Sequence, residues 1–176
     1  TLIVSDGRGG TATASILIAG GLPPLPWTVT KINIGLNFKL AGKDKIRVNG
    51  VVDLPAGWDP TGKTAIVDIG GAVQTFQLDK RGAGKVAKDR FSVRRKLKKK
   101  QFLGGAVKVQ FSLAGAFSTM LADEGLINKN TVKTGEVLSI RALMSLAGQP
   151  YEDNPPLLFK AKQDRNGKAT QKTTIR

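Results

Sequence analysis

From residue 27 onward, hydrophobic and polar residues alternate with a period of two along much of this chain. Ile32, Ile34 and Leu36 share one face of a segment whose other face carries lysine and asparagine. The alternation recurs in segments 46–54, 65–69, 91–97 and 107–113. A period of two is typical of a β-strand that buries one face and exposes the other to water. The pattern therefore predicts a β-rich main body.

Segment 137–146 has the same period and predicts one long strand. Its apolar face comprises Leu138, Ile140, Ala142, Met144 and Leu146. Segment 150–156 contains three prolines, and we expect it to be irregular, because proline cannot donate to a strand ladder. Residues 157–162 predict a further strand.

Glycine-containing turns separate these strands. Gly70-Gly71 predicts a hairpin that joins 65–69 to a strand over 72–78. The pair Asn166-Gly167 predicts another hairpin, with a return strand over 168–175. About eight strands at this close spacing favour a β-sandwich, immunoglobulin-like or jelly-roll-like.

One segment has the composition of a helix. Residues 116–124 are rich in alanine, methionine, leucine and glutamate, and Gly125 follows as a C-terminal cap. We expect a short crossover helix that joins two edges of the sheets. The predicted fold class is thus an all-β antiparallel sandwich with one short crossover helix and an N-terminal extension.

The chain divides into an N-terminal hairpin over 1–21, a proline-rich linker over 22–26 and the sandwich domain over 27–176. A lone hairpin is marginally stable in water, so the extension must pair with something. We expect it to act as an assembly strand that fills apolar slots in a partner. The candidate side chains are Leu2, Val4, Ala12, Ala14, Ile16 and Ile18.

The N-terminal stretch Ser5-Asp-Gly-Arg-Gly-Gly-Thr-Ala-Thr-Ala-Ser-Ile-Leu-Ile resembles the last hairpin of bacterial immunoglobulin-like surface repeats, of the cadherin-like or PKD-like kind. From Trp27 on, the chain resembles the lysine- and glycine-rich β modules at the ends of long bacterial surface proteins. Both resemblances imply an extracellular setting at the bacterial cell surface and a structural or adhesive role. Neither assigns functional residues.

Composition argues against enzymatic chemistry. The chain has neither cysteine nor histidine, which excludes disulfides, thiolate metal sites and the usual general base. We therefore expect a non-enzyme without cofactor or metal.

No apolar run approaches the roughly 20 residues of a membrane span. The chain starts without methionine or signal peptide, so we expect it to derive from a longer precursor or to be an excised piece.

Residues 57–64 match the phosphate-loop pattern G-x-x-x-x-G-K-[ST] letter by letter. That chemistry needs a helix directly after the loop, so that backbone N–H groups meet the phosphates. A β-branched run follows instead, and Asp59 would place a negative charge in the anion cradle. We interpret the stretch as a turn-rich connection between strands.

Basic residues concentrate between positions 80 and 100. This segment holds eleven of the 28 lysines and arginines and one of the 13 acidic residues, so it accounts for +10 of the net charge of +15. Such a cluster can hold an acidic polymer, although lysines also protect exposed edge strands from unwanted pairing; the sequence slightly favours edge protection. The anion-binding candidates on the expected strand are Arg94, Arg95, Lys96, Lys98, Lys99 and Lys100.

The leading hypothesis from the sequence is an extracellular structural protein, a subunit or module of a bacterial surface filament, fibre or matrix that assembles by β-strand addition. Its partners would be copies of itself or neighbouring β domains. Within the same class, the chain could instead be a fragment of a long surface protein. The alternative from a different class is an adhesive module that binds acidic polysaccharide or extracellular DNA without sequence specificity, through residues 80–100.

Overall fold

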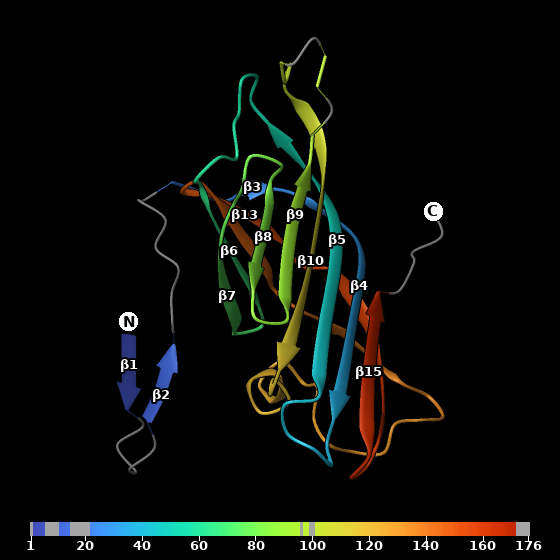
Figure 1. Cartoon of the computed structure of the whole chain (residues 1–176). Helices are drawn as coiled ribbons and strands as arrows, with labels where there is room; N and C mark the ends of the chain where they lie inside the picture. Colours follow the sequence, from blue (N-terminus) through green and yellow to red (C-terminus); the bar gives the residue numbers. More distant parts are fainter. Residues whose placement is uncertain (1, 6–10, 15–21, 96, 99–100, 172–176) are drawn as a thin grey trace.

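Two β-sheets stack face to face and form the main body (Figure 1), while β1 and β2 form a two-stranded sheet of their own. The structure is a computed structural model that describes residues 2–5, 11–14, 22–95, 97–98 and 101–171. The predicted all-β sandwich is confirmed, with antiparallel pairing throughout except between β3 and β13.

The larger sheet has eight strands in the order β11-β14-β15-β4-β5-β10-β9-β8. Its strands are β4 (Thr28–Asn37), β5 (Asp44–Leu54), β8 (Ala83–Val86), β9 (Asp89–Arg94), β10 (Gly105–Gly115), β11 (Glu136–Ser139), β14 (Pro156–Lys162) and β15 (Asn166–Gln171). The longest pairing joins β5 and β10 over eleven residues each, from Asp44↔Gly115 to Leu54↔Gly105. These two strands lie in the interior of the sheet and form its longest ladder.

The smaller sheet has five strands in the order β3-β13-β12-β6-β7. Its strands are β3 (Leu25–Pro26), β6 (Thr64–Ile69), β7 (Ala72–Gln77), β12 (Ala142–Leu146) and β13 (Gln149–Asp153). The expected hairpin at Gly70-Gly71 joins β6 to β7. Together the sheets hold more strands than the sequence suggested, partly because the segment expected to be irregular at 150–156 contains most of β13.

The segment expected as one strand over 137–146 is divided between the two sheets. β11 pairs with β14 in the large sheet, whereas β12 pairs with β6 and β13 in the small one. The chain changes sheets at Ile140 and Arg141, and Ile140 stays fully buried. The apolar face was assigned correctly, because the period of two continues through the corner of the sandwich.

The expected short helix within segment 116–124 is present as a 3-10 turn, η1 (Met120–Ala122), which is shorter than the segment suggested and is the only helical turn in the described chain. Gly125 follows with a φ of 84°, as expected of a cap. One other local prediction needs correction. The β14–β15 hairpin turns at 163–165, where Asp164 has a φ of 55°, so Asn166-Gly167 already belongs to the return strand.

A row of aromatic rings joins the two sheets inside the core. Trp27 stacks with Phe111 at 6.4 Å between ring centroids, Phe111 with Phe91 at 6.2 Å, and Phe91 lies 5.6 Å from Phe76 of the small sheet. Gly50 makes room for the Trp27 indole, since a Cβ there would lie 2.6 Å from its Cζ3. Aromatic pairs of this kind contribute beyond their buried area, so the row fixes how the sheets face one another.

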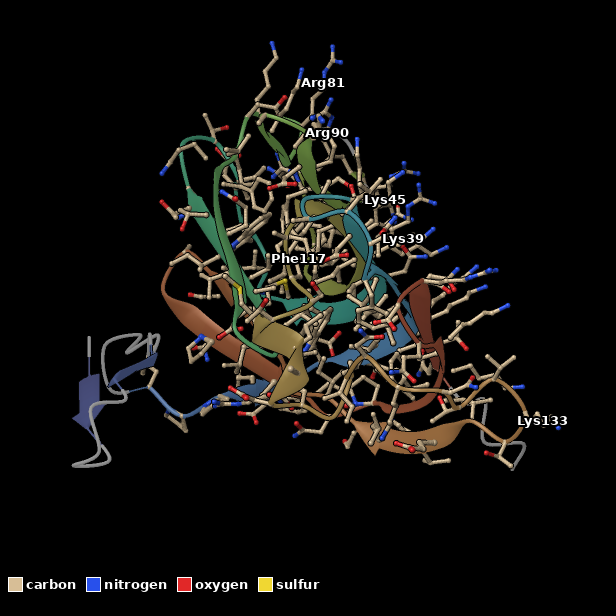
Figure 2. The ribbon with its side chains drawn as sticks, turned by 90° about the horizontal axis from the view of Figure 1, so that it is seen from below. Lys39, Lys45, Arg81, Arg90, Phe117 and Lys133 are labelled. Atoms are coloured by element: carbon tan, nitrogen blue, oxygen red, sulfur yellow. The ribbon has the colours of Figure 1, made fainter. Side chains whose placement is uncertain are left out.

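Asp44 is a buried carboxylate at the lower end of the sandwich, 1% exposed. It accepts N–H groups from Asn37 at 2.7 Å, Phe117 at 2.7 Å and Ser118 at 2.8 Å. Figure 2 labels Phe117 in this region. Three donors compensate the burial of the charge, and they tie the β4–β5 turn to the segment that leaves β10.

The N-terminal segments join the structure in two ways. β1 (Leu2–Ser5) pairs with β2 (Thr11–Ala14) as the predicted hairpin, in the register Leu2↔Ala14. Within the expected linker over 22–26, β3 pairs in parallel with β13. Trp27 Nε1 then donates to Ala142 O at 3.1 Å, so the chain enters the sandwich at a fixed point.

Among the described residues, no helix is long and apolar enough to cross a membrane.

Candidate anion-binding face

The outer face of the eight-stranded sheet, the side turned away from the small sheet, is strongly basic. Strand alternation sends the apolar residues inward and leaves lysine and arginine at outward positions of most strands (Figure 2 shows Lys45 and Arg90 on this side). The outward cations are Lys31, Lys45, Arg47, Lys85, Arg90, Arg94, Lys108, Lys160, Lys162 and Lys168. Within the described strands of this sheet, Asp53 is the one acidic residue at an outward position.

Several of these cations lie directly opposite one another on neighbouring strands. The register pairs Lys85 with Arg90, Lys108 with Arg94, and Lys160 with Lys168. Directly opposite side chains have Cβ atoms about 5 Å apart, and like charges at that distance destabilise a sheet. Among the described residues, no ion pair involves these outward cations, so the face keeps a strong positive charge.

The outer face is hollowed on both sides of Arg47. The first hollow, of about 540 Å³, is lined by residues of β5, β8, β9 and β10, including Asn49, Gln110 and Arg90. The second hollow, of about 650 Å³, is lined by residues of β4, β5 and β15, including Gly35, Lys45 and Lys168. Arg47 lines both, so the paired hollows form a shallow depression that crosses the strands.

Among the described residues that line the paired hollows, Asp79 is the one residue with a carboxylate. Its Oδ1 accepts the backbone N–H groups of Ala83 at 2.9 Å and Arg81 at 2.8 Å. The bond from Ala83, chiefly, holds the pKa of Asp79 below its usual range. The Asp79 carboxylate thus accepts hydrogen bonds from the turn that follows it in the same loop.

The structure distributes the anion-binding candidates of segment 94–100 over different environments. Arg94 points outward at the end of β9, opposite Lys108. Lys98 forms a backbone bridge with Gln101 and is exposed, while Lys96, Lys99 and Lys100 lie outside the described residues. The expectation of one basic strand through this segment is wrong, because β9 ends at Arg94.

Arg95 turns away from the outer face and holds three loops together. Its guanidinium donates to Trp58 O at 2.7 Å, to Lys80 O at 3.3 Å and to Asp59 Oδ1 at 3.3 Å. The side chain is 17% exposed. Because the guanidinium donates to acceptors within the same chain, the geometry assigns Arg95 a structural role.

The phosphate-loop letters at 57–64 lead directly into strand β6, as expected from the β-branched run. Asp59 accepts the backbone N–H of Thr61 at 3.3 Å and its hydroxyl at 3.0 Å. Chiefly because of that N–H, the pKa of Asp59 lies below its usual range. A charged carboxylate followed by a strand does not form a phosphate cradle.

The candidate assembly residues fall partly on described strands. Leu2 lies opposite Ala14 and Val4 opposite Ala12 in the β1–β2 hairpin. Ile16 and Ile18 lie outside the described residues.

Local charge density in the sequence does not predict most of the outer face. Lys45, Arg47, Lys108 and Lys168 are spread over three strands that are far apart in sequence, so they form no dense run of charge. The available signal was the alternation itself, which places each of these cations at a position opposite to the apolar face.

Comparison with known proteins found no match, either among family models, curated proteins or solved structures. In the part of the chain that the structure describes, no group of three or more acidic residues is placed to hold a metal ion.

Changing Arg95 to Gln should lower the free energy of unfolding by about 1–2 kcal/mol, because two backbone carbonyls lose a charged donor. Arg94→Gln is the matched control, with the same charge change on an exposed neighbour, and should alter stability by less than about 0.5 kcal/mol. Urea denaturation of the two variants measures the difference. Equal stabilities would contradict the structural role of Arg95.

Proposed function

We propose that this protein is a non-enzymatic module that binds acidic polymers through the outer face of its eight-stranded sheet. The observation that carries the proposal is the direct opposition of like charges at Lys85/Arg90, Lys108/Arg94 and Lys160/Lys168. Each pair costs stability in the free protein. A ligand with closely spaced negative charges offsets that cost and gains from every pair it bridges.

The chemistry of the face favours binding that is driven by charge and tolerant of sequence. Lysine and arginine pair with carboxylate, sulfate or phosphate groups through charge-assisted hydrogen bonds. Binding of a polyanion releases its condensed counterions, so the affinity must fall steeply with salt. The extracellular bacterial setting implied by the resemblance supplies polymers with these groups, and we include that setting in the proposal.

Arg47 lines both hollows and gives the sharpest test. Arg47→Gln should weaken binding of heparin and of a mixed-sequence DNA duplex, and should lower the slope of log affinity against log salt by about 1. Fluorescence anisotropy at several salt concentrations measures both quantities.

The matched control is Arg141→Gln, which removes the same charge near the small sheet. Arg141 pairs with Glu152 at 3.1 Å there, and its loss should leave polyanion affinity unchanged. An Arg47→Gln protein with wild-type affinity and slope, or equal losses in both variants, would exclude the outer face as the binding surface.

A second candidate function is assembly by strand addition from the N-terminal segment, as a subunit or module of a surface filament. The observation that favours it is the isolation of β1 and β2 in a two-stranded sheet of their own. Two strands alone are marginally stable, and their free edges can gain main-chain hydrogen bonds from a neighbouring domain or copy.

Deletion of residues 1–21 tests this second candidate. The shortened protein should remain a folded monomer in analytical ultracentrifugation, whereas the full chain should form larger species at the same concentration. Electron microscopy of both samples shows whether filaments exist. Polymer that persists unchanged after the deletion, or a full chain that stays monomeric, would refute strand addition.

A further inference from the structure

The paired hollows give the outer face a defined shape, although a flat cationic surface would be enough to bind an acidic polymer by charge alone. Arg47 stands between them, and their lining runs from β8 through β9, β10 and β5 to β4 and β15. The depression therefore crosses the strands instead of following them. Volumes of about 540 and 650 Å³ lie in the range of sites that hold small organic groups.

Gly35 keeps the second hollow open. Gly35 faces outward between Lys45 on β5 and Lys168 on β15. A Cβ added to Gly35 would meet no atom within 4 Å, so the space above this residue is free. A ring-sized group can lie there with a lysine on each side.

Carboxamides line both hollows beside the cations. In the first hollow, Gln110 Nε2 donates to Asn49 Oδ1 at 3.1 Å across the β5–β10 pair. This bond orients both amides and leaves one N–H₂ group and one carbonyl oxygen directed to other partners. Asn33 and Asn37 line the second hollow. Each hollow thus combines donors, acceptors and positive charge.

This combination suits sugar rings better than a nucleic-acid backbone. Sugar hydroxyls both donate and accept hydrogen bonds, as amides do, whereas phosphate oxygens only accept. Single-stranded nucleic acids are held largely by stacking on aromatic rings. The outward positions of the described strands in this sheet carry cationic, amide, hydroxyl, small and aliphatic side chains together with Asp53, and these provide no such platform.

We propose that the paired hollows bind an acidic polysaccharide that lies across the strands, with sugar rings in the hollows and its carboxylate or sulfate groups on the flanking lysines and arginines. This inference rests on the proposed function, since it names the ligand class of the same face. The amides form hydrogen bonds with the sugar hydroxyls, and the cations pair with the acidic groups.

Two variants that keep the net charge test the proposal. Gly35→Leu fills the second hollow, and Gln110→Leu removes the amide from the first. Gln77→Leu is the matched control, because Gln77 makes a similar cross-strand bond to Thr64 Oγ1 at 3.0 Å on the small sheet. Circular dichroism checks that each variant is folded. The probes are heparin and polygalacturonate as acidic polysaccharides, and a DNA duplex and inorganic polyphosphate as polyanions that lack free sugar hydroxyls or lack sugar entirely.

Each hollow variant should weaken binding of at least one acidic polysaccharide by about tenfold, as measured by titration calorimetry. Binding of DNA and polyphosphate should change less than about twofold, because the charges are unchanged. Gln77→Leu should bind all four probes as the wild type does.

Equal effects on all probes, or no effect of either variant, would overturn the polysaccharide inference and leave a face that recognises charge alone. Preference of the wild-type protein for DNA or polyphosphate would overturn it as well. Failure of the wild-type protein to bind any of the four probes would instead refute the proposed function itself.

Discussion

The arrangement of this molecule depends on the burial of only one face of its eight-stranded sheet. The small sheet and the aromatic row from Trp27 to Phe76 cover the inner face. Because side chains alternate along a strand, each buried residue fixes its neighbour on the water-facing side. A shift of one residue would exchange the two faces, so burial of the core determines where the outer cations lie.

This coupling explains why the protein tolerates like charges in direct opposition. Lys108 and Arg94 face each other because Val109 and Val93 are paired in the core. A one-residue change of register would separate these charges, but it would also expose the apolar residues, at a cost of roughly 1.5–3 kcal/mol for each large side chain. The electrostatic cost of an opposed pair is smaller, on the order of 1 kcal/mol or less. Packing therefore prevails, and the sheet presents a preorganised cationic surface.

The sequence predicted the sandwich well because strand alternation is a local signal. It placed the β6–β7 hairpin and the apolar face of segment 137–146, although it could not show that Ile140 lies at a corner between two sheets. Segment 150–156 was expected to be irregular but forms most of β13, because this strand lies near the edge of the small sheet, where proline is tolerated.

The candidate site was harder to predict, since Arg94 and Arg95 are adjacent in sequence but differ in direction. Strand order brings Lys45 and Lys168 to either side of Gly35, and no local pattern contains that information.

Binding of acidic polymers to the outer face can be tested by lysine acetylation footprinting with mass spectrometry. In the presence of heparin, Lys45, Lys85, Lys108 and Lys168 should lose reactivity, because a bound polyanion covers their ammonium groups. Lys63, which precedes β6 of the small sheet, should react as in the free protein. Protection of Lys63 while the four outer lysines stay reactive would refute binding at the outer face.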